Sequence, residues 1–259
     1  MPELPDLQVF CRNLGKKIEG KKVRSVSVFR SKKLNIPEKK LNAALDNQTI
    51  EKVKRVGKEL YLEFGGGKAL AIHLMLNGEL HLFEKISEHK YKVLELLFTD
   101  GSGLVLTDPR GFAKATWDPE QNEGVDALSE ELTTDFLKEK LSHKKTVIKN
   151  FLLDQKIIQG IGNAYADEIL WKTGISPFSI CNKIPEVKIG ELAKAIKIVL
   201  EKAEKEIFNK HPGIISGEVR DFLLIHHPDK KESPNGALIH TKKTGSRKTY
   251  FTDEQELFT

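Results

Sequence analysis

Cysteine, methionine and tryptophan are scarce in this sequence, with two of each among 259 residues. Cys11 and Cys181 lie far apart in the chain, so we expect no disulfide framework, and two cysteines cannot build a tetrathiolate zinc site. No apolar run approaches the roughly 18–20 residues that a membrane helix requires, and the N-terminus shows no charged-then-apolar secretory leader. These absences predict a cytoplasmic protein with no membrane segment and no membrane partner.

The chain is mildly basic, with a formal net charge of +5 at pH 7. Much of the excess lies in residues 228–248, where six basic side chains face only Asp229 and Glu232. The six are Lys230, Lys231, Lys242, Lys243, Arg247 and Lys248. Such a patch permits a polyanionic partner, although many solvated surfaces are also rich in lysine.

The hydrophobic pattern changes along the chain. Residues 5–18 show helical spacing, whereas the next part alternates with a period of two, which indicates strands. The expected strands are 23–28, 61–64, 69–76, 80–83, 93–98 and 104–107, separated by glycine-rich turns. Many short strands with tight turns predict an antiparallel sandwich or barrel.

A linker is expected at residues 118–130, and helical periodicity follows it. The expected helices are 130–141, 144–153, 163–173, 186–209 and 217–226. Residues 237–241 and 248–252 then favour a terminal β-hairpin around Thr244-Gly245-Ser246. The length suits more than one domain, and we place three, at 1–125, 126–227 and 228–259.

The N-terminus, Met1-Pro2-Glu3, carries a possible nucleophile. Removal of Met1 would leave Pro2 with a free secondary amine, and an α-amino group has a reference pKa of about 7.7–8.0. Such an amine is partly unprotonated at neutral pH and can form a Schiff-base-type iminium with an aldehyde-level carbon. Glu3 could supply or accept the proton. The alternative is a merely extended, solvated terminus.

A second informative segment is Asp154 to Glu168, in which Gly160 and Gly162 bracket a tight turn before a helix that begins near Asn163. Glycines let a backbone approach a ligand, and a helix N-terminus offers free N–H groups to an anion. Lys156 and Asn163 are therefore candidate contacts to a phosphate. An ordinary helix corner with Asn163 as N-cap explains the pattern equally well.

These two segments together resemble the formamidopyrimidine-DNA glycosylase / endonuclease VIII family of base-excision repair enzymes. The resemblance runs nearly end to end and implies an α+β fold: an N-terminal helix with an antiparallel β-sandwich, a helix–two-turn–helix domain and a DNA-binding hairpin. It assigns Pro2 as the nucleophile at C1′ and Glu3 as its acid/base partner. It also implies that Lys58 engages a DNA phosphate, and Asp6 replaces a more usual glutamate.

A base-flipping enzyme must fill the gap that the extruded base leaves in the stack. The resemblance implies that Leu76, Arg110 and Phe112 do so here. Leu76 stands where the formamidopyrimidine branch usually has methionine, which is closer to the endonuclease VIII branch. Gly111 stands where a second basic residue is common.

The C-terminal hairpin departs from the zinc finger that many family members carry. Alignment on Arg247 places the four ligand positions at Glu232, Asn235, Thr252 and Gln255, none of them a thiolate, so we predict a zincless finger and no metal. Arg247 is expected to grip DNA phosphates, because a guanidinium binds phosphate through two parallel hydrogen bonds. The alternative for Arg247 is a hairpin-tip charge that only aids solubility.

The expected function is that of a bifunctional DNA glycosylase/AP lyase, acting as a monomer on double-stranded DNA with oxidised bases or abasic sites. No cofactor is expected, because the amine itself is the electron sink. The segment after the last helix is too short for the loop that caps a flipped purine, so the preferred lesion stays open. The alternatives are a non-catalytic binder of damaged DNA or structured nucleic acid, and a ribosome-associated binder.

Overall fold

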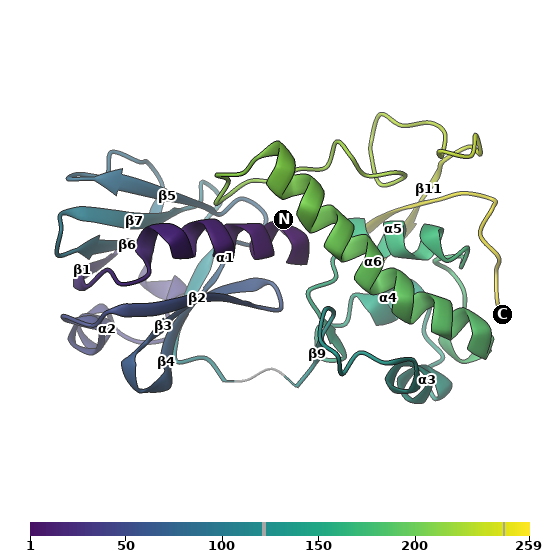
Figure 1. Cartoon of the computed structure of the whole chain (residues 1–259), viewed down its shortest axis with the longest axis horizontal. Helices are drawn as coiled ribbons and strands as arrows, with labels where there is room; N and C mark the ends of the chain where they lie inside the picture. The colour runs from purple at the N-terminus through teal and green to yellow at the C-terminus, as the bar shows by residue number, and fades with distance from the viewer. Residues whose placement is uncertain (121–122, 246) are drawn as a thin grey trace. The chain divides into compact units, whose positions relative to one another are not determined.

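The computed structural model describes residues 1–120, 123–245 and 247–259, and the chain forms two compact units (Figure 1). The first unit contains residues 1–121 and 207–218, and the second contains residues 122–206 and 219–259. Among the described residues, none of the helices combines the length and the apolarity needed to cross a bilayer.

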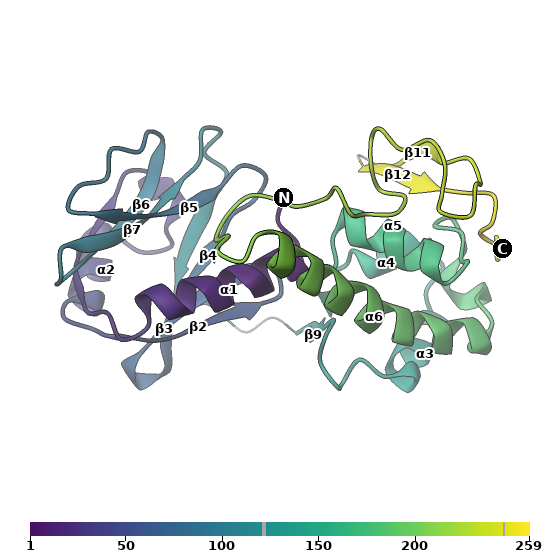
Figure 2. The same cartoon turned by 45° about the horizontal axis from the view of Figure 1, so that its top comes forward.

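The first unit contains two four-stranded antiparallel sheets, with strand orders β1-β6-β7-β5 and β2-β3-β4-β8 (Figure 2). Their strands are β1 (Val23–Val28), β2 (Ile50–Val56), β3 (Glu59–Phe64), β4 (Lys68–His73), β5 (Glu79–Glu84), β6 (Lys92–Phe98), β7 (Ser102–Thr107) and β8 (Lys114–Trp117). Inward-facing residues of both sheets join one hydrophobic core, as expected for a β-sandwich. The short helices η1 (Ser31–Lys33), α2 (Glu38–Leu45) and η2 (Gly65–Gly67) lie in the connections.

Helix α1 (Leu4–Ile18) packs against this core through a continuous apolar stripe. Leu7, Phe10, Leu14 and Ile18 recur at helical spacing and are almost completely buried. Full burial of each such side chain is worth about 1.5–3 kcal/mol. Pro5 lies in the first turn, where its missing N–H has no intrahelical partner to lose. The packing of α1 therefore fixes the position of residues 2 and 3.

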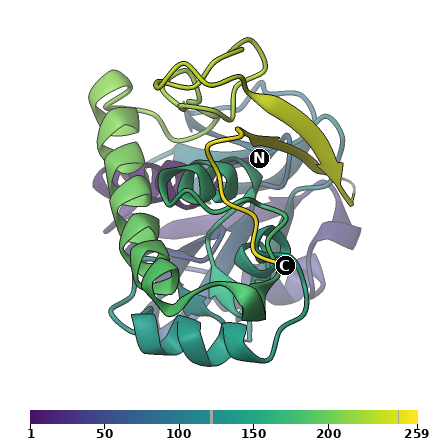
Figure 3. The ribbon, with the colours of Figure 1, turned by 90° about the vertical axis from the view of Figure 1, so that its right-hand side faces the viewer.

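The second unit is helical, with a terminal hairpin (Figure 3). Its helices are α3 (Thr134–Ser142), α4 (Ile148–Leu152), α5 (Asn163–Lys172), η3 (Cys181–Lys183) and α6 (Glu186–Lys210), and the last residues of α6 are counted in the first unit. The hairpin consists of β11 (His240–Thr244) and β12 (Arg247–Phe251), and β12 packs against α5. The short strands β9 (Val125–Asp126) and β10 (Ile158–Gln159) pair in parallel.

The predicted α+β class is confirmed, as are helix α1, the sandwich, the helical region and the C-terminal hairpin. The predicted helix at 217–226 is wrong. The backbone N–H groups of Leu224, Ile225 and His226 donate to the carboxylate of Glu168, at 2.8–2.9 Å. A side chain therefore satisfies the donors that a helix would have satisfied internally.

Other boundaries also differ from the prediction. The expected linker contains β9, whose pairing with β10 ties it into the second unit. Helix α3 begins at Thr134 because Thr133 caps it, accepting a hydrogen bond from the N–H of Phe136 at 3.1 Å. The first hairpin strand begins at His240 instead of residue 237. One residue of the predicted hairpin turn, Ser246, lies outside the described residues.

Candidate active site and nucleic-acid interface

Pro2 and Glu3 lie immediately before α1, and both are buried. The N–H of Glu3 donates to Oδ2 of Asp6 at 2.8 Å, and Asp6 is itself fully buried. This bond closes one half of a capping box at the start of the helix, so Asp6 orients the residue that precedes it. With Met1 attached, the nitrogen of Pro2 is part of a peptide bond, and the Met1 ammonium pairs with Glu218.

Three loops emerge at the same end of the β2-β3-β4-β8 sheet. They are the β2–β3 turn with Lys58, the turn 74–78 after β4, and the loop 108–113 before β8. The strand register explains this arrangement. In the antiparallel pair β3–β4, Leu60 lies opposite Ile72, and in the antiparallel pair β4–β8, His73 lies opposite Lys114, so the start of β3, the end of β4 and the start of β8 lie at the same end of the sheet. The structure thus brings Lys58, Leu76, Arg110 and Phe112 to one edge of the first unit.

Lys58 has two neighbours that the sequence pattern did not single out. His73, at the end of β4, interacts electrostatically with the positive charges of Lys114 and Lys58. Burial, reinforced by these two lysines, lowers the pKa of His73 to about 4. The result is a cationic cluster around a neutral imidazole, formed by cross-strand pairing between residues distant in sequence.

The turn that carries Leu76 is held in an unusual backbone conformation. Met75 has a positive φ of 55°, and its N–H donates to Nδ1 of His73 at 3.0 Å. A Cβ atom on Gly78 would collide with the carbonyl of Leu74 and approach Ala113, so only glycine fits there. The side chain of Leu76 is 56% exposed at this turn.

Asp108 organises the loop that carries Arg110 and Phe112. Its fully buried carboxylate accepts hydrogen bonds from the N–H groups of Arg110, Phe112 and Ala113 at 2.7–2.8 Å. Burial acts to raise the pKa of Asp108, but these backbone donors outweigh it and leave the pKa below its ordinary value. Phe112 is 45% exposed, with the Arg110 guanidinium 5.7 Å from its ring centroid.

In the second unit, a tight turn precedes α5. Gly160 has a φ of 100°, which favours glycine, and its N–H donates to Oε1 of Gln155 at 2.9 Å. The N-cap of α5 is Gly162, so Asn163 is the first helical residue and not the cap. Lys156 is exposed beside this turn. Asn163 donates from Nδ2 to the carbonyl of Lys248 at 3.0 Å.

The hairpin is attached to the helices by a buried polar network. Nζ of Lys149 lies 2.6 Å from Oδ1 of Asp167, and both side chains are completely buried. Oδ2 of Asp167 accepts the N–H of Tyr250, and Nζ of Lys149 contacts the hydroxyl of Thr249 at 2.9 Å. Arg247 is exposed at the start of the same strand. Strand β12 therefore presents Arg247 from a firmly anchored backbone.

Three of the four positions aligned with zinc ligands, Asn235, Thr252 and Gln255, make hydrogen bonds to other residues. Oε2 of Glu254 accepts hydrogen bonds from Ser233, Thr252 and Trp171 at 2.9–3.1 Å, while Oε1 accepts one from Asn235 at 2.7 Å. Gln255 accepts the N–H of Thr252 and donates to the carbonyl of Ile175. No group of three potential metal ligands exists among the residues that the structure describes.

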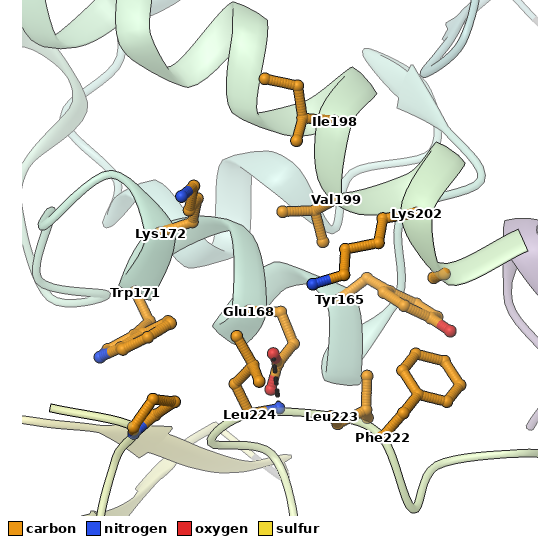
Figure 4. A pocket seen from close by; sticks show the side chains of 12 residues that line it. Tyr165, Glu168, Trp171, Lys172, Ile198, Val199, Lys202, Phe222, Leu223 and Leu224 are labelled. Carbon is orange, nitrogen blue, oxygen red and sulfur yellow. Dashed lines mark hydrogen bonds between the residues drawn. The ribbon is translucent and has the colours of Figure 1, made fainter. Parts of the chain in front are cut away.

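An apolar pocket of about 400 Å³ lies between α5, α6 and the segment 222–224 (Figure 4). Glu168, on its wall, holds that segment through the backbone bonds described above. Burial raises the pKa of Glu168 despite the three donors. None of the predicted site residues lines this pocket.

Comparison with protein-family models identifies the class of protein to which the chain belongs. Residues 1–115 match the model of the formamidopyrimidine-DNA glycosylase N-terminal domain, and residues 124–209 match that of the H2TH domain of the same proteins. The fold and both domains are those of a DNA glycosylase. The chain belongs to the formamidopyrimidine-DNA glycosylase / endonuclease VIII family.

Individual relatives agree with this. The chain is 34% identical over 215 residues to the formamidopyrimidine-DNA glycosylase of Lactobacillus helveticus, covering 79% of this chain and 78% of that one. It is 30% identical over 267 residues to that of Lactobacillus gasseri, with 97% of each chain covered. The Lactococcus lactis enzyme bound to DNA with an abasic site superimposes with a TM-score of 0.88 at 27% identity, over 98% of this chain and 100% of that one. The same enzyme has been solved with Fapy-dG DNA, with equal TM-score, identity and coverage.

Proposed function

We propose that this chain is a bifunctional DNA glycosylase and AP lyase that removes oxidised bases from double-stranded DNA. The observation that carries the proposal is the Pro2-Glu3 dipeptide, held at the start of a buried helix in a member of this family. The solved relatives with abasic-site and Fapy-dG DNA support the substrate class.

The chemistry requires removal of Met1. The freed amine of Pro2 then attacks C1′ of the damaged nucleotide, and the C1′–base bond breaks as the N–C1′ bond forms. The departing base takes the bonding electrons and a proton, and Glu3 assists ring opening and proton transfer. The resulting iminium acidifies the C2′ and C4′ protons, whose loss expels the 3′ and then the 5′ phosphate. The iminium formed from this amine is the electron sink, so the proposal includes no cofactor.

The remaining assignments concern DNA binding. Lys58 engages a phosphate near the lesion, and Leu76, Arg110 and Phe112 fill the space left by the flipped base. Three further residues bind phosphates of the DNA backbone: Lys156, Asn163 and Arg247. Formamidopyrimidines, 8-oxoguanine and oxidised pyrimidines are the candidate lesions. We further propose a zincless finger, a monomeric state, a cytoplasmic location and the three-part division at 125/126 and 227/228.

Borohydride trapping tests the central claim. Mature protein is incubated with duplexes that carry an abasic site or one of several oxidised bases, and reduction converts the iminium into a stable adduct. We expect an adduct with the wild type and none with Pro2→Gly, and loss of base excision with Glu3→Gln. Tight binding without any adduct would instead favour a non-catalytic damage sensor. The ranking across bases identifies the preferred lesion.

A further inference from the structure

Arg30 lies against the loop that carries Arg110 and Phe112. It follows β1 and precedes η1, and the chain beyond it runs beside β8, with a parallel bridge between Leu34 and Ala115. Asn35 reinforces this pairing through two hydrogen bonds to the backbone of Trp117, both 2.8 Å long. Four residues before that bridge on each segment lie Arg30 and Gly111.

The guanidinium of Arg30 occupies the place of a side chain at position 111. A Cβ atom added to Gly111 would lie only 1.6 Å from Nη1 of Arg30. Gly111 also has a positive φ of 68°, a conformation that other residues adopt only with strain. A positive charge from Arg30 therefore lies at position 111 of the loop, where the residue of the loop itself is glycine.

This guanidinium makes no hydrogen bond and no ion pair with any residue in the described parts of the chain. Arg30 is half-buried, so part of its charge is withdrawn from water. Five N–H donors in a planar fork are suited to an anion with two parallel acceptors, and a phosphate is such an anion.

The surroundings are also cationic. Lys33 lies 5.9 Å and Arg110 lies 5.7 Å from the ring centroid of Phe112. The carboxylate of Asp108, in the same loop, is fully buried and directed at backbone N–H groups, so it is engaged within the loop. Lys33 and Arg110, which come from two different segments, thus flank the exposed ring of Phe112, the residue that follows Gly111.

We propose that Arg30 is a further DNA-binding residue, whose guanidinium binds a backbone phosphate beside the loop 108–112. The proposal rests on the proposed function, because it assumes that this loop meets DNA. The competing explanation is that the aliphatic stem of Arg30 only packs over Gly111 and supports the loop.

The salt dependence of binding separates these explanations. Affinity of the mature chain for a duplex with a tetrahydrofuran abasic-site analogue is measured over a range of salt concentrations. Each phosphate contact contributes about 0.9 to the slope of log K against log salt. We expect Arg30→Gln to reduce the slope by about this amount and Arg30→Lys to retain it. Arg24→Gln, an exposed arginine on β1, is the matched control and should keep the wild-type slope.

A relocation variant adds a second readout. Replacing Arg30 by alanine vacates the space beside Gly111, so in the double variant Arg30→Ala/Gly111→Arg the new side chain fills that space with its Cβ and carries its guanidinium further out along the same loop. We expect this variant to recover the slope that Arg30→Ala loses, with some loss of thermal stability from the positive φ. A merely structural role predicts no recovery.

The proposal is overturned if Arg30→Gln and Arg30→Lys weaken binding equally with unchanged slopes. Borohydride trapping on the same wild-type preparation keeps this outcome distinct from failure of the proposed function. A Pro2-dependent adduct with an unchanged Arg30→Gln slope rejects Arg30 alone. Absence of any adduct rejects the lyase, whatever the slopes.

Discussion

The side chain of Asn163 joins the first turn of α5 to the hairpin, because its Nδ2 donates to the carbonyl of Lys248 at 3.0 Å. An amide nitrogen carries two hydrogens, so while one holds the hairpin the other can make the phosphate contact that we propose for Asn163. Asn163 thus couples the tight turn to the strand that carries Arg247.

This dual role gives a prediction for substitutions at Asn163. Asn163→Ala should weaken binding to abasic-site DNA and destabilise the hairpin by about 0.5–1.5 kcal/mol, the value of one hydrogen bond. Asn163→Asp should weaken binding further, because a carboxylate repels both the phosphate and the Lys248 carbonyl. Equilibrium binding measures the order, and the exposed Asn182→Asp is the control. Equal effects of alanine and aspartate would contradict it.

Lys149 and Asp167 form a buried ion pair, so we expect the effects of substituting them on the free energy of unfolding to be strongly non-additive. Removal of one partner leaves a buried charge uncompensated, which costs about 3–5 kcal/mol. Lys149→Met and Asp167→Asn should each lower the unfolding free energy by about that amount, measured by chemical denaturation. The double variant should lose clearly less than the sum of the two, because neither charge then remains alone. Strict additivity would show that the pair does not interact.

We expect the hydrogen bonds of Glu254 to stabilise the region around the hairpin without a metal ion. The pKa of Glu254 is lowered by the hydrogen bond from Asn235 and then by that from Trp171, so the carboxylate is ionised at neutral pH. Glu254→Ala should expose the lysine-rich hairpin to faster tryptic cleavage and change the fluorescence of Trp171. Glu232→Ala, at an aligned ligand position with an exposed carboxylate, should change neither. Chelators should leave wild-type cleavage rates unaltered, and faster cleavage after chelation would reveal a structural metal.

The elements with strong periodicity could be predicted from the sequence. Helix α1 and helix α5 matched within about a residue: apolar residues recur at helical spacing in α1, and in α5 the Gly160–Gly162 turn marks the start while Gly174 marks the end. Strand β2 was missed because a register shift between Ile50 and Lys52 interrupts its alternation. The short helix α2 was missed because only Leu41 and Leu45 mark its buried face.

The residues of the candidate site also fall into two groups, those that the sequence alone predicts and those that depend on tertiary contacts. Motif positions such as Pro2 and Asn163 can be read from local sequence, since their neighbours in the chain define them. The proximity of Lys58, His73 and Lys114 depends on strand register, and that of Arg30 to Gly111 depends on a bridge between distant segments. Gly111 looked like the loss of a basic residue, yet the Arg30 guanidinium fills that space. Tertiary contacts of this kind leave no periodic signal.

His73 predicts how stability depends on pH. Its pKa falls from 6.5 to about 4 on folding, so the unfolded chain binds a proton between these values and the folded chain does not. The free energy of unfolding should therefore decrease as the pH falls from 6.5 to about 4, by about 3 kcal/mol at most from this group. Below that range both states are protonated, and the contribution levels off.

The variant His73→Asn isolates this contribution. Its amide oxygen can still accept the N–H of Met75, as Nδ1 of His73 does, but it cannot be protonated. Burial and then His89 also lower the pKa of His81, so the wild type and the variant share that background. We expect a flatter profile in denaturant titrations of the variant between pH 4 and 6.5. The exposed His143→Asn should follow the wild type, and parallel profiles for all three proteins would show that His73 does not control this transition. Protonation of Nδ1 would also break its bond to Met75, so acid should loosen the turn that presents Leu76.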